Sequence, residues 1–262
     1  MGSIPTTSTI KHFVWWISIP GKFQMPYILS PMIGLKSPGM WSEGDAYEKK
    51  SIYSIQDGKL PPVNYDEHII RSHSLTHLET PAHTNADGKR LDYFYDNKKD
   101  LFFGKTLVLR LTGNNFKDVG NGIHHWVVTV QEIQDRIVYL NLKSIPSKIL
   151  ITVENCPLNA QGYHDPNYVL TLSQESADFL VRDEHFHLYG TSWKSSDFKP
   201  GSSERPIHNT IFKKALILEN LKLDSVPEGI YFMSAFPIPF IHASESPVVP
   251  VLFTKEELLA SL

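Results

Sequence analysis

Cysteine is nearly absent from this sequence of 262 residues, which contains only Cys156. A single cysteine cannot form an intrachain disulfide, and it excludes a metal cluster held by several thiolates. This cysteine usage is compatible with a reducing compartment, so we expect a cytoplasmic protein.

Long hydrophobic runs are also absent. The apolar stretch from Phe13 to Ile19 is ended by Pro20 and is shorter than the roughly 20 residues that a membrane-spanning helix needs. The N-terminus lacks the charged start and apolar core of a signal peptide. We therefore predict no membrane partner and interpret residues 13–19 as a first strand, with an interfacial anchor as the alternative.

No charge of one sign dominates the chain. The 25 Lys and Arg residues are interspersed with 28 Asp and Glu residues, which gives a formal net charge of -3. This balance argues against nucleic-acid and acidic-membrane partners. The hydrophobic content of 41% and the charged content of 20% are those of an ordinary globular protein. Because no repeat or shift in composition divides the chain, we predict one domain over residues 1–262.

Within this domain we expect a loose tail over residues 1–8 and a long, irregular region with short strands over residues 20–64. The irregular region is rich in proline, glycine, serine and aromatic residues, and includes Pro38-Gly39 and Pro61-Pro62. Segments of this composition often cover a site, so we predict that residues 20–64 cover a pocket.

The rest of the chain has regular hydrophobic patterns. Apolar segments predict strands over residues 66–73, 105–111, 149–153, 187–190, 215–219, 230–234 and 248–253. Capping residues predict helices that begin at Thr129, at Thr171 or Ser173, and at Thr254. Helices alternate with strands only in the middle of the chain. We therefore predict a single-domain α/β fold with a mixed, barrel-like β-sheet core and flanking helices.

The segment from His73 to His83 contains three histidines and a carboxylate within eleven residues. Imidazole and carboxylate groups are the ligands that zinc and similar divalent ions take from proteins. His77 and Glu79 would share one face of a strand. A fully extended chain would separate His73 from His77 by about 13 Å, so the backbone must bend near Leu75 if both residues bind one ion. A metal site is favoured over a histidine-rich surface strand.

Two later segments offer further candidates. Glu219 ends an apolar strand, where an unpaired carboxylate would be costly, and His208 begins a short helical segment before it. Ser192 to Asp197 form a polar loop at a strand end, where sites in such folds often lie. Trp41 is the aromatic residue that we expect to contact a substrate. For His124 and His125, in a Gly/Asn-rich loop, a surface or subunit contact is favoured over catalysis.

The segment from His73 to His83 resembles the H-x-G-T-H-x-D-x-P-x-H motif of the cyclase-like metal-dependent hydrolases, which include bacterial kynurenine formamidase and isatin hydrolase. The resemblance continues in order through Asn85 to Asp92, Gly190 to Asp197, Pro206-Ile207-His208, Ile217 to Leu221, and Phe236 to Val248. It covers most of residues 65–253. It implies the swivelling β/β/α fold of that family.

The resemblance also implies roles for individual residues. The implied metal ligands are His73, His77, Glu79, His208 and Glu219, which would hold one or two divalent ions. Zinc is the expected ion and manganese is the alternative. His83 matches the family's proton donor and acceptor. The implied reaction is hydrolysis of an N-formyl aromatic amine, as in N-formylkynurenine, or of a cyclic amide. We add Trp41, Ser195 and Asp197 as candidate substrate contacts, and we expect a homo-oligomer, as family members often are.

The sequence departs from the family pattern at several positions. Leu75 replaces a glycine, Glu79 replaces an aspartate, and the interval from His208 to Glu219 is one residue shorter than usual. Ser192-Trp193 replaces the usual Asp-Thr, which predicts an altered pocket. Two alternatives to the hydrolase hypothesis follow: a relative that binds metal or ligand without catalysis, and a metal-dependent lyase that uses the same site.

Overall fold

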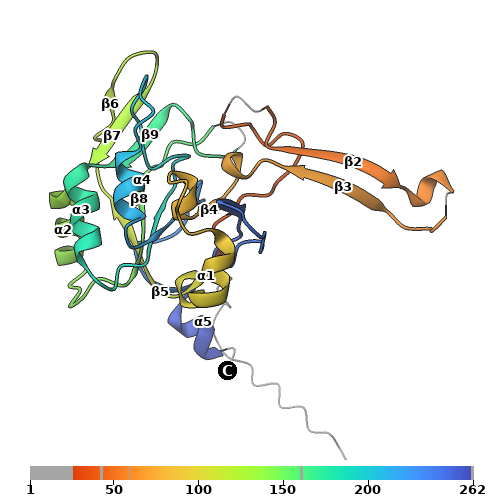
Figure 1. Ribbon diagram of the computed structural model, residues 1–262. Helices are drawn as coiled ribbons and strands as arrows, with labels where there is room; N and C mark the ends of the chain where they lie inside the picture. Colours follow the sequence, from red (N-terminus) through yellow and green to blue (C-terminus); the bar gives the residue numbers. More distant parts are fainter. Residues whose placement is uncertain (1–25, 42–43, 59, 160–161, 261–262) are drawn as a thin grey trace, which may run out of the picture.

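The computed structural model describes residues 26–41, 44–58, 60–159 and 162–260 (Figure 1). The tail predicted over residues 1–8 and the strand predicted over residues 13–19 lie outside these ranges. The described residues contain no helix that is both long enough and apolar enough to cross a bilayer.

The centre of the fold is a nine-stranded mixed sheet in the order β1-β14-β12-β5-β8-β10-β11-β4-β13. Strands β5, β8, β10 and β11 run parallel, and the outer strands pair antiparallel. The strands of this sheet are β1 (Tyr27–Ile28), β4 (His77–Glu79), β5 (Phe103–Leu111), β8 (Lys148–Val153), β10 (Leu188–Thr191), β11 (Leu216–Glu219), β12 (Gly229–Ser234), β13 (Glu245–Pro247) and β14 (Val251–Phe253).

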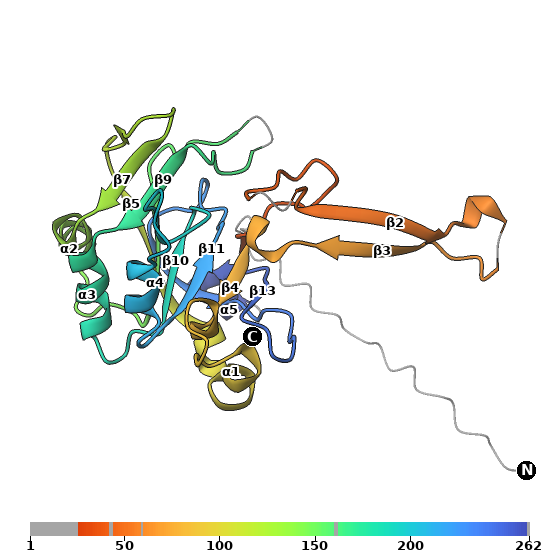
Figure 2. The same cartoon turned by 45° about the horizontal axis from the view of Figure 1, so that its top comes forward.

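Both faces of the sheet are buried, which explains why its central strands are apolar without alternation. All six residues of β8 are buried. Ile149 and Ile151 pack into the cluster beneath α2 (Val130–Tyr139), α3 (Gln174–Arg182) and α4 (Pro206–Ile211). Leu150 packs on the opposite face, beneath α1 (Leu91–Asn97) and the 3₁₀-turn η4 (Lys99–Phe102). The helices therefore flank the sheet on both sides (Figure 2).

Two smaller sheets lie outside this core. The first joins β6 (Lys117–Asp118), β7 (His124–Val128) and β9 (Tyr168–Leu172). The second pairs β2 (Tyr47–Tyr53) with β3 (Tyr65–Ile70), and the 3₁₀-turn η1 (Ile55–Asp57) lies in the connection. The β2–β3 hairpin projects from the body of the molecule, and we call it the arm (Figures 1 and 2). A final helix, α5, spans Lys255–Ala260.

The structure confirms the mixed α/β fold and most predicted elements, and it corrects several details. Residues 20–64 include the seven-residue strand β2 as well as irregular chain, and His124 and His125 lie in β7 instead of a loop. The N-cap of α3 is Ser173, because Thr171 lies within β9. The capping boxes at Thr129 and Thr254 are present.

Candidate metal centre

A 3₁₀-turn brings the first histidine back toward the second. The turn η2 spans Ser72–Ser74 and therefore contains His73, and Leu75 follows it in an extended conformation with φ -117° and ψ 176°. The predicted bend thus lies just before Leu75, which adopts a backbone conformation open to any residue. His73 Nδ1 consequently lies 3.2 Å from His77 Nε2.

Strand pairing brings the last predicted carboxylate to the same place. In the antiparallel pair of β4 with β11, His77 lies opposite Glu219, at the carboxyl end of β11. His77 and Glu79 are two residues apart on β4, so their side chains share one face, and His77 Nε2 lies 3.1 Å from Glu79 Oε1. The sheet thereby places three buried polar side chains, those of His77, Glu79 and Glu219, close together near the carboxyl end of β11.

Helix α4 supplies His208. The helix begins with Pro206, whose missing N–H would have had no partner in the first turn. Asp197 accepts hydrogen bonds from the backbone N–H groups of Ile207 and His208, at 2.9 and 3.1 Å. The second oxygen of Asp197 also lies 2.6 Å from His208 Nδ1. Asp197 thus fixes both the start of the helix and the orientation of the imidazole.

Glu79 lies at the centre of the resulting cluster. Its Oε1 atom lies 3.1 Å from His77 Nε2, 3.5 Å from His73 Nδ1 and 3.3 Å from His83 Nε2. Its Oε2 atom lies 3.1 Å from His208 Nε2, which is also 3.4 Å from Glu219 Oε1. The two oxygens of one carboxylate therefore serve different histidines.

The buried groups perturb one another's protonation. Burial alone would lower the pKa of His77 and His208, but the adjacent carboxylates outweigh it and raise both pKa values, that of His208 strongly. Burial would raise the pKa of Glu79, but the hydrogen bonds from His208, His73 and His77 hold it well below its usual range. His83 differs from these groups: burial lowers its pKa, and the nearby His73 and His208 lower it further.

The chemistry of the donor set fits a divalent metal ion. His77 Nδ1 lies 2.8 Å from the carbonyl oxygen of Leu75, and His208 Nδ1 faces Asp197, so each of these nitrogens carries the proton in the neutral ring. Without a cation, the raised pKa values favour a second proton on Nε2, which can then donate to the carboxylate oxygens; a neutral ring would instead point its Nε2 lone pair at the lone pairs of those oxygens. A cation between them converts this repulsion into coordination, and a hydrogen-bonded second ring nitrogen is typical of metal-bound histidine.

The cluster opens into a cavity of about 390 Å³ that is lined by Trp41, Arg71, Ser72, His73, Glu79, His83, Ser195, Arg205, His208 and Glu219. Trp41 and Ser195 therefore lie where the substrate-contact prediction requires. Asp197 does not line this cavity. The Asp197 carboxylate is only 4% exposed, and its oxygens already accept hydrogen bonds from the start of α4. Its location therefore favours a role in positioning His208 over contact with the substrate.

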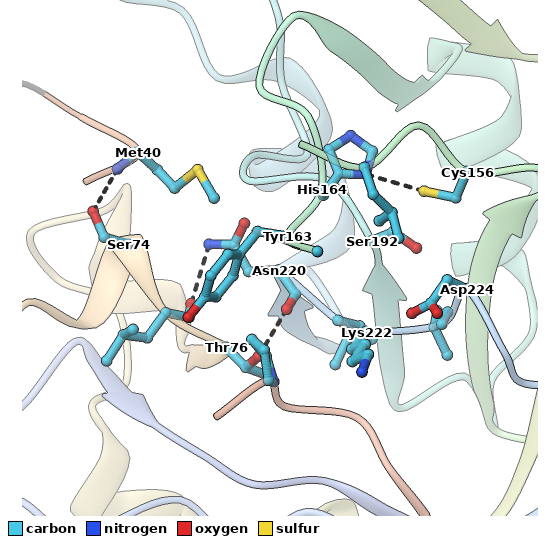
Figure 3. Close-up of a pocket in the computed structure, with 16 residues that line it drawn as sticks. Met40, Ser74, Thr76, Cys156, Tyr163, His164, Ser192, Asn220, Lys222 and Asp224 are labelled. Carbon is cyan, nitrogen blue, oxygen red and sulfur yellow. Dashed lines mark hydrogen bonds between the residues drawn. The ribbon is translucent and has the colours of Figure 1, made fainter. Parts of the chain in front are cut away.

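A second cavity, of about 30 Å³, lies behind the His73–Thr76 segment (Figure 3). It has room for about one water molecule. Asn220 lines it and fastens the segment: its amide nitrogen donates hydrogen bonds to the carbonyl groups of His73 and Leu75, both at 3.1 Å. The hydroxyl of Thr76 donates a hydrogen bond back to the carbonyl group of Asn220, at 2.7 Å.

Sequence reasoning missed three residues near the centre. In the sequence Asn220 is one member of the Ile217–Leu221 motif, and an asparagine directly after an apolar strand was the available signal of a turn; the residue adopts a left-handed conformation there. Arg205 directly precedes the Pro206-Ile207-His208 motif, and its position was the available signal. Glu245 lies 3.8 Å from His73 Nε2, but it reaches this place only through the pairing of β13 with β4. No local pattern reveals that contact.

Comparisons with known proteins find similar sequences. The chain is 25% identical to kynurenine formamidase from Delftia acidovorans over 230 residues, which is 86% of this chain and 95% of that protein. It is 29% identical to kynurenine formamidase from Paracidovorax citrulli over 199 residues, which is 75% of this chain and 83% of that protein. No family profile matches the chain.

Solved structures share the fold. Isatin hydrolase A from Ralstonia solanacearum superposes with a TM-score of 0.66 at 18% identity, covering 88% of this chain and 92% of that one. A protein described as a novel cyclase gives a TM-score of 0.67 at 11% identity, covering 88% of each chain. In its sequence relatives, in the order of its motifs and in its fold, this chain is similar to the cyclase-like metal-dependent hydrolases.

Proposed function

We propose that the protein is a metal-dependent amidohydrolase that cleaves the C–N bond of an N-formyl aromatic amine, as in N-formylkynurenine, or of a cyclic amide. The observation that carries this proposal is the convergence of His73, His77, Glu79, His208 and Glu219 on one buried cluster at the floor of a cavity. Sequence relatives named as kynurenine formamidases support it.

These five side chains would hold the metal. When bound, a divalent ion lowers the pKa of water toward about 7 and polarises the carbonyl group that is attacked. Nitrogen and oxygen donors of this kind suit zinc, with manganese as the alternative. Because the two oxygens of Glu79 face different histidines, Glu79 would serve as a ligand whether the site holds one ion or two.

His83 would move the protons. It lies on the 3₁₀-turn η3 (Pro81–His83), lines the cavity, and is 24% exposed, whereas His77 is fully buried. Its Nε2 atom lies 3.3 Å from Glu79 Oε1, so the ring is held next to the metal ligands yet faces the substrate space. From there it can accept a proton from the attacking water and deliver it to the leaving nitrogen.

The walls of the cavity suggest the type of substrate. The Trp41 ring is 41% exposed and can stack on an aromatic amine, while Ser195 offers a hydroxyl group. Arg205 lines the cavity and forms no salt bridge with a carboxylate among the described residues. We therefore propose that the aromatic substrate carries an anionic group that Arg205 binds. A cytoplasmic homo-oligomer is part of the same proposal.

The test is hydrolysis by the purified, metal-loaded protein of a panel that contains N-formylkynurenine, N-formylanthranilate and isatin. We expect turnover of at least one compound, with zinc or manganese bound in stoichiometric amount. Turnover of none, with the metal in place, would favour the binding-only relative. A product formed by elimination without uptake of water would favour the lyase.

His83→Ala should lower kcat by about 10²–10⁴-fold, because it removes the proton carrier and spares the ligands. Metal content, measured by elemental analysis, should stay unchanged. The matched control is His185→Ala, since His185 is 78% exposed and far from the cluster. Normal turnover in His83→Ala would refute the assignment of His83.

A further inference from the structure

A third cavity, equal in volume to the one at the candidate metal centre, lies behind the elements that carry His83 and His208. It has a volume of about 390 Å³, within the range of pockets that bind small molecules. It lies near the starts of β10 and β11, whereas the candidate metal centre lies at their carboxyl ends. None of the proposed metal ligands lines it.

The walls of this cavity are aromatic and cationic. Tyr93, Phe94, Phe186 and Phe212 supply rings, and Lys89, Lys98, Lys213 and Lys214 supply ammonium groups. Only Asp100 and Glu184 oppose these lysines among the lining residues. In the described part of the chain no carboxylate lies within 4.0 Å of Lys98 or Lys213, although the whole protein is acidic.

A buried cation strengthens the local positive charge. Lys148, at the start of β8, is 3% exposed and has no salt bridge among the described residues. Burial lowers the pKa of Lys148 and the carboxylate of Asp100 opposes this effect, while Lys148 adds to the effect of burial in lowering the pKa of His187; Asp100 and His187 both line the cavity. Burial of an unpaired ammonium group is costly, and a nearby anion would reduce that cost.

We propose that this cavity is a second binding site, for a small carboxylate with an aromatic body. The rings would pack against the apolar part, and Lys98 and Lys213 would bind the carboxylate. The ligand would touch Pro81, the first residue of η3, and Phe212, whose ring centroid lies 5.7 Å from that of His208. Ligand binding would therefore shift the elements that position His83 and His208 and so change the rate of hydrolysis. This coupling rests on the proposed function.

Calorimetric titration of the metal-loaded protein with benzoate tests the site, with binding at the metal cavity counted separately as the part that Arg205→Gln removes. The variant Lys98→Gln/Lys213→Gln should weaken benzoate binding at least tenfold, because both lysines are exposed and their loss spares the fold. The control Lys117→Gln/Lys255→Gln changes the net charge equally on β6 and α5, away from the cavity, and should bind within twofold of wild type. Equal binding by the two double variants would overturn the proposal.

Two further probes test the ligand class and the coupling. Benzyl alcohol and inorganic phosphate should each bind at least fivefold more weakly than benzoate, and equal binding by either would refute the proposed chemistry.

The coupling is tested by turnover. Saturating benzoate should change kcat, measured at saturating substrate, at least twofold in the wild-type protein and not in Lys98→Gln/Lys213→Gln. No change in the wild-type protein would refute the coupling. Binding is measured without turnover, so failure of the proposed hydrolysis would leave the binding result standing.

Discussion

At the scale of single residues, the most perturbed histidine outside the metal centre is His164. Burial lowers its pKa to about 4 and raises that of the Cys156 thiol to about 11. The ring bridges the two partners: Nε2 lies 2.6 Å from the carbonyl oxygen of Tyr168, and Nδ1 lies 3.1 Å from Cys156 Sγ. His164 is therefore neutral in the folded protein and donates from Nε2 to the Tyr168 carbonyl, while Nδ1 faces the Cys156 thiol, the contact drawn in Figure 3.

This arrangement predicts acid destabilisation. Because the folded pKa of about 4 lies below the ordinary value of 6.5, the unfolded chain takes up the proton first as the pH falls. The contribution of His164 to stability is complete above pH 6.5 and is lost between pH 6.5 and 4, by at most about 3 kcal/mol.

Urea unfolding at pH 7 and pH 4.5 should show that His164→Gln loses less stability on acidification than wild type. Glutamine keeps a donor for the Tyr168 carbonyl but does not titrate. His185→Gln, at an exposed position, should behave as wild type. A variant as acid-sensitive as wild type would show that His164 is not the responsible group.

Asn220 supports a second prediction at this scale. Asn220→Gly keeps the left-handed conformation, at φ 56°, but removes the amide that fastens the His73–Leu75 segment. Loss of such indirect support for ligands typically costs about 10–100-fold in metal affinity, which competition with a chelating dye would measure. Asn141→Gly is the control, since Asn141 has φ 50° and lies after α2. Unchanged metal affinity in Asn220→Gly would contradict the proposed support.

At the scale of elements, local signals located most of the fold. The capping box at Thr129 and the apolar run at Ile149 are properties of a few neighbouring residues, and the structure has α2 and β8 there. Strand β13 and strand β2 of the arm have no such signal, whereas β3 overlaps the strand predicted over residues 66–73. Strand β13 is three residues long, and β2 is a charged strand whose pattern does not alternate. Their formation depends on pairing with distant segments.

The same division applies to the candidate centre. The resemblance located His73, His77, Glu79, His208 and Glu219, and the structure brings these five side chains together. The use of Asp197 to orient His208 could not be predicted, because it depends on the docking of the loop against the start of α4. From the sequence alone, a carboxylate in a short polar loop is equally compatible with binding the substrate and with capping a helix.

The capping box of α2 allows a direct test at this scale. Thr129 accepts a hydrogen bond from the Glu132 backbone N–H, and the Glu132 side chain accepts one from the Thr129 N–H. Thr129→Ala should lower the free energy of unfolding by about 1 kcal/mol, because it removes the cap and leaves N–H groups without partners. Thr129→Ser retains the hydroxyl and should cost less than half as much in chemical denaturation. Equal losses would show that the methyl group, and not the cap, is what matters.

At the scale of the whole molecule, the arm is the part that the core does not explain. It is a two-stranded hairpin, which is marginally stable in water on its own. Tyr65, Ile69 and Ile70 are 57%, 48% and 40% exposed. The charged side chains of the arm pair with each other, since Lys49 lies 2.8 Å from Asp66 and Lys50 lies 3.6 Å from Glu67, so the apolar side chains are what the arm leaves exposed.

We therefore expect a homo-oligomer held in part by the arm. Light scattering after size-exclusion chromatography should give a mass that is a multiple of 29.8 kDa. Ile69→Lys should shift the protein toward the monomer, because it places a charge in the apolar part of the contact. Val138→Lys is the control, since Val138 is 77% exposed on α2. A wild-type monomer, or equal dissociation by both variants, would refute this role. Arg71, which directly follows β3 of the arm, lines the metal cavity. If contacts between copies hold the arm in place, loss of the oligomer should displace Arg71 and raise KM for any substrate.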